Sequence, residues 1–488
     1  MLSGFFWSAL AMFYSRIRSV ASTAAVTSLF TATVAQAGNC SSSVIPHPSI
    51  PGGQVLDLSA VPVSNYAYDE STLDFCNVTV TYTHPGKNDT IHATVWLPFT
   101  NWNHRLQGSG GGGFAMRSED AVLAAAVAQN YTVLATDGGH DLNSQSSASW
   151  SLDASGNVNM ALLEDFAYVA LGDAATIGKQ IATSFYGLAP RYSYWNGCST
   201  GGRQGLMLAQ RYPTAYDGIM AAAPAINWAI LDGVISAPDL CDFDPFTTVD
   251  TRVNCSGVSV RISKKDAEVA NSAWEGFRSS EGSFLWYGLD KGTPLSMGAS
   301  SLASTVCSTP FNCTGSPFAI SSDWIRRFVL QDPSFDLTTL DHKALDRVFS
   351  LSKERYNDII STDNPDLSAF KQAGGKMITW HGLSDTLIFP KGTEQYYKRV
   401  EEKDPSVRDF YRFFKAPGVH HCSGGVGPVP VDPLSQVVDW VENGVVPETV
   451  DALAADGRRR NLCQYPLVSV YKGGDVKDAA SYRCEEGH

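Results

Sequence analysis

The pentapeptide GCSTG at residues 197–201 constrains the fold of this chain more than any other stretch. It has the form G-x-S-x-G and lies between the aromatic run RYSYW, which suits a strand, and a helical stripe of apolar residues that stops at Pro213. A serine on a sharp turn between a strand and a helix leaves no room for side chains at the flanking positions, which accounts for the glycines. The pattern predicts that Ser199 projects above a sheet as a nucleophile.

Partners for this serine follow later in the chain. On an α/β-hydrolase sheet a triad runs in the order serine, acid, histidine, each on a loop after a strand. The run KMITWH at residues 376–381 reads as a buried strand, and Asp385 in the loop after it is the candidate acid. Residues 410–414 read as a second short strand, and the loop after them holds His420 and His421, one of which is the candidate base.

A glycine-rich string, GSGGGGFA at residues 108–115, lies between two predicted strands. Such a run is a flexible linker in one interpretation. In hydrolases this position carries an oxyanion loop, where glycine lets backbone N–H groups approach the substrate carbonyl without a Cβ clash. We assign the oxyanion hole to the backbone N–H groups near Gly113 and of Thr200, the residue after the nucleophile.

Composition limits the partners of the chain. Its 488 residues allow two or three units at about 150 residues per domain. A hydrophobic content of 44% and a charged content of 17% are typical of a globular protein. The net charge of -13 argues against nucleic acid or an anionic membrane as a partner.

The N-terminus has the pattern of a secretory signal. Two arginines precede an apolar run over residues 20–34, and the A-x-A motif of a cleavage site follows at residues 35–37. We therefore expect residues 1–37 to be a signal peptide and the protein to be secreted, with an uncleaved anchor as the alternative because residues 2–13 are also apolar. No later stretch of 18 residues is apolar, so no membrane association is expected after signal removal. Six N-x-S/T sequons fit this route, at Asn39, Asn77, Asn88, Asn130, Asn254 and Asn312.

Taken with the cysteines, these motifs resemble the tannase and feruloyl esterase family of fungi and bacteria. The resemblance is carried by the Cys-Ser pair at the elbow, by Asp385, by the His-Cys pair at residues 421–422 and by the string GGGGFA. It selects His421 over His420, because His421 is the one that adjoins the cysteine. The loop DGGH at residues 137–140 is also similar to a family loop, and we expect its histidine, His140, to be structural.

The resemblance implies a disulfide between Cys198 and Cys422, beside the active site. In the chain-entropy model, a bond that closes so long a loop stabilises the fold by roughly 4 to 5 kcal/mol. Ten cysteines in a secreted chain should be largely oxidised. We further pair Cys463 with Cys484 and Cys40 with Cys76, and leave open the pairing of Cys241, Cys255, Cys307 and Cys313.

The hydrolase pattern breaks off between residues 226 and 375. We expect an α/β-hydrolase core in two parts, residues 38–225 and 376–488, with an inserted lid domain between late strands at residues 226–375. Some aromatic residues of this insertion should line a pocket for an aromatic acyl group. The candidates are Trp274, Phe277, Trp286, Tyr287 and Trp324.

The lid departs from the family pattern at its start. In relatives an acidic calcium loop, bounded by two cysteines, follows the P-A-x-N-W segment. Here only Asp232 and the carbonyl of Val234 match calcium ligands, and Cys241 matches the closing cysteine without its partner. Ca²⁺ takes six to eight oxygens, so the resemblance implies a structural Ca²⁺ site that is incomplete in an apparently shortened lid. Catalysis by a serine triad requires no cofactor.

The resemblance implies a secreted serine esterase that acts on phenolic acid esters, with Ser199 as nucleophile, His421 as base and Asp385 orienting the imidazole. The expected substrate is a small phenolic ester or a feruloylated polysaccharide. Feruloyl esters of plant cell-wall arabinoxylan come first and galloyl esters of tannins second, because the shared motifs do not separate them. The alternative from another class is a secreted binding protein on a hydrolase fold, made inactive by the gap in the lid.

Overall fold

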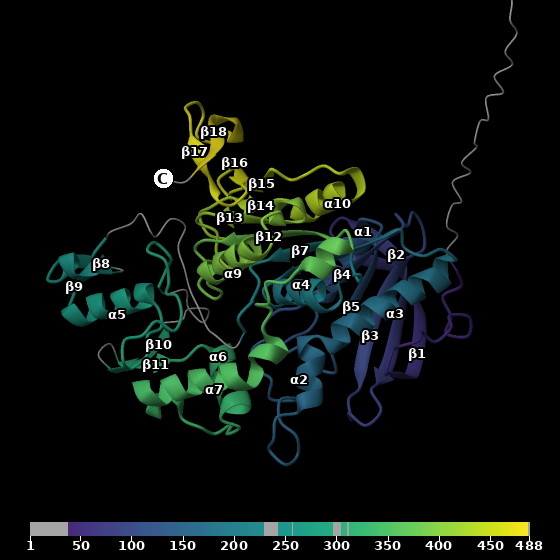
Figure 1. Ribbon diagram of the computed structural model, residues 1–488, viewed down its shortest axis with the longest axis horizontal. Coiled ribbons are helices and arrows are strands. Elements are labelled where there is room, and N and C mark those ends of the chain that lie inside the picture. Colours follow the sequence, from purple (N-terminus) through teal and green to yellow (C-terminus); the bar gives the residue numbers. More distant parts are fainter. Residues whose placement is uncertain (1–37, 229–242, 256, 296–303, 310–311, 487–488) are drawn as a thin grey trace, which may run out of the picture. The chain divides into compact units, whose positions relative to one another are not determined.

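The computed structural model describes residues 38–228, 243–255, 257–295, 304–309 and 312–486 (Figure 1). Its core is a nine-stranded sheet in the order β1-β2-β3-β5-β4-β6-β7-β12-β13. The strands are β1 Gln54–Tyr68, β2 Ser71–Thr83, β3 Ile91–Pro98, β4 Arg105–Ser109, β5 Thr132–Thr136, β6 Tyr192–Cys198, β7 Gly218–Ala222, β12 Lys376–Gly382 and β13 Tyr411–Ala416.

The sheet changes from antiparallel to parallel along its width. Strands β1, β2 and β3 form an antiparallel meander, and β3 pairs antiparallel with β5. From β5 to β13 all neighbouring strands are parallel. This is the α/β-hydrolase core that the motifs predict. Because β4, β6, β12 and β13 are parallel, the loops that carry the glycine string, the serine, the acid and the histidine all start from one edge of the sheet.

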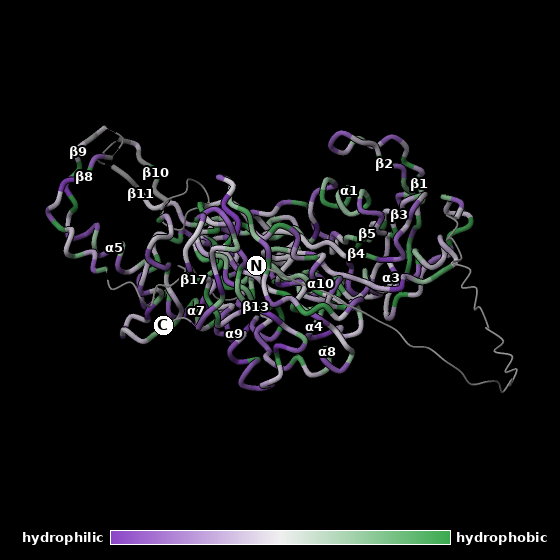
Figure 2. The backbone as a smooth tube through the Cα atoms, turned by 90° about the horizontal axis from the view of Figure 1, so that it is seen from above, coloured by the Kyte–Doolittle hydropathy of each residue, from purple (hydrophilic) through white to green (hydrophobic). Residues whose placement is uncertain are grey.

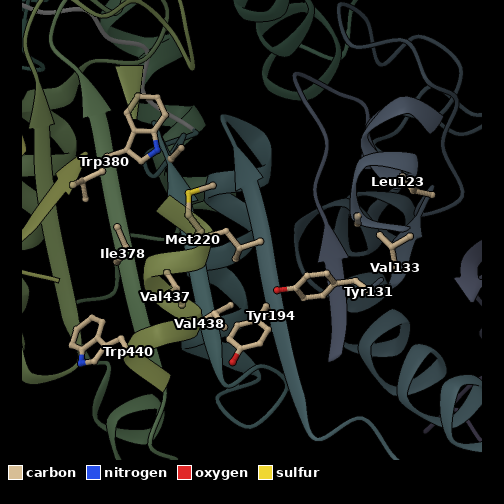
Figure 3. Packing of buried hydrophobic residues seen from close by; sticks show 14 of the residues in the cluster. Leu123, Tyr131, Val133, Tyr194, Met220, Ile378, Trp380, Val437, Val438 and Trp440 are labelled. Carbon is tan, nitrogen blue, oxygen red and sulfur yellow. The ribbon is translucent and has the colours of Figure 1, made fainter. Parts of the chain in front are cut away.

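Helices pack on the sheet through apolar faces. Two of them, α1 Asp120–Ala128 and α10 Pro433–Asn443, share one hydrophobic cluster with the strands (Figure 3). Val437 and Trp440 of α10 lie in this cluster with Ile378 of β12. Figure 2 shows apolar residues along β5, and every residue of this strand is buried. The other helices of the core are α2 Met160–Ala167, α3 Val169–Tyr186, α4 Thr200–Arg211 and α9 Pro390–Lys403.

The apolar spacing from Leu163 to Phe185 predicts helix throughout, but the structure divides this stretch. Helix α2 ends and α3 begins at Tyr168, whose backbone angles of φ -158° and ψ -32° are not helical. The guanidinium of Arg203 donates to the carbonyls of Phe166 (2.9 Å) and Ala167 (3.0 Å), which lie at the end of α2. The break thus leaves carbonyl groups that a buried side chain satisfies.

A long insertion separates β7 from β12. Its described elements are η2 Pro245–Thr248, β8 Arg252–Cys255, β9 Val258–Arg261, α5 Lys264–Glu275, β10 Ser304–Thr309, β11 Asn312–Ser316, α6 Ala319–Trp324, η3 Ile325–Val329, η4 Leu337–Thr339, α7 His342–Ile360 and α8 Ser368–Gln372. The insertion contacts the core at Asp323, whose carboxylate accepts from the N–H (2.6 Å) and the hydroxyl (2.5 Å) of Ser147.

The C-terminal part adds small sheets beyond β13. Their strands are β14 Val429–Pro430, β15 Thr449–Leu453, β16 Arg459–Cys463, β17 Leu467–Tyr471 and β18 Tyr482–Glu486. The short helix η6 Ala479–Ser481 precedes β18, and η5 Val407–Asp409 lies before β13. In the part of the chain that the structure describes, no helix is both long and apolar enough to cross a membrane. The expected signal peptide, residues 1–37, lies outside the described residues.

Candidate active site

Ser199 occupies the sharp turn between β6 and α4. Its φ of 62° and ψ of -119° lie in a region that residues with a side chain rarely adopt. The turn is held by its backbone, because the N–H of Ser199 donates to the carbonyl of Ala222 (3.1 Å). A Cβ on Gly197 would come within 2.5 Å of the backbone of Gly201, so this close approach requires glycine. The structure therefore has the strained elbow that the pentapeptide predicts.

Asp385 lies in the loop after β12 and is fully buried. Its Oδ1 accepts from the N–H groups of Leu387 (2.8 Å) and Ile388 (2.9 Å), and its Oδ2 accepts from Nδ1 of His421 at 2.7 Å. Burial opposes ionisation of Asp385, but the adjacent imidazoles of His421 and His381 outweigh it and hold the pKa of this carboxyl well below its usual range. The carboxylate is thus ionised beside His421.

The two histidines after β13 behave differently. The ring of His421 contacts Asp385. The backbone N–H of His420 donates to the carbonyl of Gly424 at 3.2 Å. A disulfide joins Cys198, which precedes the serine, to Cys422, which follows His421, across 224 positions of sequence and with 6.0 Å between the Cα atoms. It ties the elbow directly to the histidine loop.

Two further disulfides are present in the described residues. They join Cys40 to Cys76 and Cys463 to Cys484. Cys241 lies outside the described residues, as do the candidate calcium ligands Asp232 and Val234, so the calcium site stays a prediction.

The glycine loop is bound to the start of α4. The N–H of Gly111 donates to Oε1 of Gln204 (3.1 Å), and the N–H of Gly201 donates to the carbonyl of Gly111 (2.9 Å). The hydroxyl of Thr200 donates to the carbonyl of Gly113 at 2.7 Å. These bonds bring the two residues assigned to the oxyanion hole together.

Gly113 and Thr200 present backbone donors at this point. Among the described residues, neither N–H has a hydrogen-bond partner, whereas the next N–H along the loop, that of Phe114, donates to the carbonyl of Ser144 at 2.9 Å. The N–H of Thr200 also lies at the first turn of α4, where the helix dipole favours negative charge. The arrangement can hold an oxyanion.

Ser199, His421, Gly113 and Thr200 line one cavity. Its other walls are mainly apolar and come from the segment after β7, from the insertion and from the loop after β12. They are formed by Ile226, Trp228, Phe318, Ile320, Trp324, Leu387, Ile388 and Phe389. The cavity suits a flat apolar group next to the serine.

Sequence reasoning identified Trp324 as a candidate for this pocket but missed most of its walls. Phe318, Ile320 and the run from Leu387 to Phe389 belong to no motif, and only the tertiary structure brings them beside Ser199. The run KMITWH predicts His381 only as a residue of a buried strand, yet its ring contacts the carboxylate of Asp385. The sequence signal that could have indicated this contact is the four-residue spacing between His381 and Asp385 at the end of a buried strand.

His140 has the structural role expected of it. It is 6% exposed, and its Nε2 lies 2.9 Å from the carbonyl oxygen of Leu162. Burial lowers the pKa of His140 to about 4, so the ring is neutral and donates to that carbonyl. Its ring packs on Trp150, with 4.1 Å between the ring centroids.

A second cluster of side chains with metal-binding atoms joins the loop between β2 and β3 to helix α2. Ligand-type atoms of His84, Asp89 and Asp165 lie within 4.8 Å of one another. Asp89 already accepts from the hydroxyl of Thr83 (2.7 Å), from the N–H of His84 (2.7 Å) and from the ring of His84 (2.6 Å). Burial and the charge of Asp89 raise the pKa of Asp165 to about 8. A proton on Asp165 therefore accounts for its burial without a cation.

Comparison with known proteins agrees with this geometry. The family described as tannase and feruloyl esterase matches residues 76–231 and 229–485. A probable feruloyl esterase of Arthroderma benhamiae is 36% identical, over 90% of this chain and 92% of the relative. Feruloyl esterase B of Aspergillus niger is 28% identical, over 89% of this chain and 91% of the relative.

Solved structures lead to the same family. The tannin acyl hydrolase from Aspergillus niger superimposes with a TM-score of 0.80 at 25% identity, over 91% of this chain and 94% of that chain. Feruloyl esterase B from Aspergillus oryzae gives a TM-score of 0.74 at 27% identity, over 90% and 97%. The resemblance seen in the elbow and His-Cys motifs is confirmed. The chain belongs to the tannase and feruloyl esterase family and is a carboxylic ester hydrolase.

Proposed function

We propose that this protein is a secreted serine esterase that hydrolyses phenolic acid esters, with feruloyl esters of plant cell-wall arabinoxylan as the first candidate substrate. The observation that carries the proposal is the cavity in which Ser199 and His421 face an apolar aromatic pocket while Asp385 accepts from Nδ1 of His421 at 2.7 Å. A small phenolic ester or a feruloylated polysaccharide would place its acyl ring in this pocket.

In the acylation step, Ser199 Oγ attacks the ester carbonyl carbon and its proton passes to Nε2 of His421. Asp385 keeps the other ring nitrogen protonated and stabilises the imidazolium by charge. The oxyanion of the tetrahedral intermediate accepts from the N–H groups of Gly113 and Thr200. His421 then gives its proton to the departing alcohol, and the acyl group remains on Ser199.

In the deacylation step, His421 takes a proton from water, and the resulting hydroxide attacks the acyl carbon. The same backbone donors hold the second oxyanion. The bond to Ser199 Oγ breaks, the serine regains its proton from His421, and the phenolic acid leaves. The cycle consumes one water, and no cofactor takes part in it.

The walls of the pocket favour ferulate over gallate. A feruloyl group carries one hydroxyl and one methoxy group on its ring, whereas a galloyl group carries three hydroxyls that need hydrogen-bond partners when buried. Phe318, Ile320 and Trp324 of the insertion contribute apolar surface to the pocket. Relatives named feruloyl esterase support the first substrate, and the similar tannin acyl hydrolase supports a galloyl ester as the second candidate.

The insertion at residues 226–375 acts in this proposal as a lid, because it supplies one wall of the cavity beside the serine. Secretion is supported by the disulfides at Cys40, Cys198 and Cys463, since such bonds persist in oxidising compartments.

Hydrolysis of methyl ferulate, methyl gallate and a short chromogenic ester by the secreted protein tests the proposal. Ser199→Ala should abolish all activity, whereas the control Ser155→Ala, in an exposed turn, should keep it. Cleavage of ferulate without gallate supports the feruloyl substrate, and the reverse makes the protein a tannase. Activity that persists in Ser199→Ala overturns the mechanism. A wild-type protein that cleaves none of the three esters is instead a binding protein on a hydrolase fold.

A further inference from the structure

His381, the penultimate residue of β12, is fully buried against the carboxylate of Asp385. Its Nε2 lies 3.1 Å from Oδ2 of Asp385 and 3.0 Å from the carbonyl oxygen of Ile388. The carbonyl oxygen of Ile388 and the ionised carboxylate of Asp385 are acceptors without a hydrogen to donate. Nε2 of His381 therefore carries the hydrogen and donates it to both oxygens. The same Oδ2 accepts from His421 at 2.7 Å. One carboxylate oxygen thus receives hydrogen bonds from two imidazoles.

The other nitrogen of His381 is also engaged. Nδ1 lies 2.9 Å from the hydroxyl oxygen of Thr393, a residue of α9 that is 2% exposed. The hydroxyl can donate to Nδ1, which leaves the ring neutral with its one hydrogen on Nε2.

The four hydrogen bonds on Asp385 occupy both of its oxygens. Oδ1 accepts two backbone N–H groups, from Leu387 and Ile388, and Oδ2 accepts the two imidazoles. An ionised carboxylate offers about four lone-pair sites, so these hydrogen bonds fill them and restrain rotation of the group. Loss of the hydrogen bond from His381 would leave one buried lone pair of Oδ2 without a partner. Oδ2 would then be restrained only by His421, the residue whose ring Asp385 must orient.

We propose that His381 is a positioning residue of the triad, whose Nε2–H holds Oδ2 of Asp385 toward His421 and withdraws part of the carboxylate charge. This inference rests on the proposed function, in which Asp385 orients His421. Because Asp385 shares its charge with His381, it stabilises the imidazolium form of His421 less than an unshared carboxylate would. Removal of this hydrogen bond should return the full carboxylate charge to His421 and so favour its protonated form.

The test compares variants at position 381 with a short chromogenic ester between pH 4 and pH 9. His381→Leu removes the donor, His381→Gln keeps an N–H at a similar reach, and His381→Asn keeps the amide but is too short. We expect His381→Leu and His381→Asn to lower kcat by roughly 10- to 100-fold, as other groups that orient a catalytic ligand do. The acidic limb of the kcat/KM profile, which reports the base in the free enzyme, should move up by about one pH unit. His381→Gln should restore most of kcat and the position of the limb.

Each outcome is decisive. A wild-type kcat and acidic limb in folded His381→Leu would overturn the inference. Equal losses in all three variants with an unmoved limb would also overturn it, because packing alone would then explain the loss. If His381→Leu does not fold, the contrast between His381→Gln and His381→Asn carries the test. Ser199→Ala runs alongside, and activity in that variant would refute the proposed function itself, whereas an inactive Ser199→Ala with unaffected His381 variants refutes only this inference.

Discussion

At the scale of single residues, Gly112 and Gly113 are adjacent but differ in what they tolerate. A Cβ on Gly112 would meet nothing within 4 Å. A Cβ on Gly113, where φ is +56°, would come within 2.0 Å of the carbonyl oxygen of Ser144. Alanine substitution at these two neighbouring positions therefore compares a methyl group that fits with one that clashes, in the loop assigned to the oxyanion hole.

We expect Gly113→Ala to lower kcat by about 100- to 1000-fold, the usual cost of losing one oxyanion donor, because the loop must move to relieve the clash. Gly112→Ala should retain most of the activity. Steady-state kinetics with a short chromogenic ester check both variants, and urea unfolding checks that each is folded. Similar kcat values in the two variants would mean that this loop does not supply a donor.

At the scale of elements, the β2–β3 hairpin and helices α2 and α3 bury three carboxyl groups around one imidazole. His84 lies between Asp89, at 2.6 Å, and Asp173, at 3.1 Å, and Asp165 is 2% exposed beside them. Burial, followed by the charge of Asp89, raises the pKa of Asp165 to about 8 from an ordinary value of 3.8. The folded protein therefore keeps a proton on Asp165 at a pH where the unfolded chain has lost it.

This proton makes stability depend on pH with a definite sign. The stabilising contribution is complete below pH 3.8 and falls as the pH rises toward 8, by up to about 1.4 kcal/mol per pH unit, because the unfolded state binds fewer protons. Above pH 8 the folded state also ionises and the loss levels off. Asp165→Asn removes the titrating group. The free energy of unfolding of this variant, relative to that of the wild type, should therefore increase steadily from pH 5 to pH 8.

Urea unfolding at unit pH intervals measures this gain. Asp57→Asn, which removes a charge from an exposed position of β1, is the control and should show no such trend. A difference between Asp165→Asn and the wild type that stays constant with pH would show that Asp165 is ionised in the folded protein.

At the scale of the whole molecule, two disulfides differ in loop length and in what they adjoin. Cys198–Cys422 spans 224 positions and adjoins Ser199 and His421, whereas Cys463–Cys484 spans 21 positions. In the chain-entropy model their removal costs about 5 and about 3 kcal/mol respectively.

We expect the double variant Cys198→Ala/Cys422→Ala to lose activity at temperatures where it is still folded, because the histidine loop is no longer tied to the elbow. Cys463→Ala/Cys484→Ala should lose stability and keep kcat. Thermal unfolding and ester hydrolysis on the same samples separate the two effects. Equal kcat values in both double variants would show that the first bond has no positioning role.

Much of the fold and of the candidate site could be predicted from the sequence, because the residues that determine them are close neighbours in the chain. The glycines around Ser199, the alternating runs that become β2 and β3, and the buried strand before Asp385 depend on neighbours within a few residues, which the order of the chain preserves. The choice of His421 rested on a resemblance, since position along the sequence did not separate it from His420. The helix break at Tyr168 was missed, because the apolar spacing continues through it.

What the sequence by itself determined is therefore the hydrolase class, the order of the candidate triad and the place of the glycines proposed for the oxyanion hole. Only the tertiary structure decided which side chains wall the pocket, that His381 contacts the carboxylate of Asp385, and that Asp165 is buried among like charges. The physical reason is that burial and Coulomb interaction depend on distance in space, and packing brings together groups such as His84 and Asp173, or Cys198 and Cys422, that no local pattern relates.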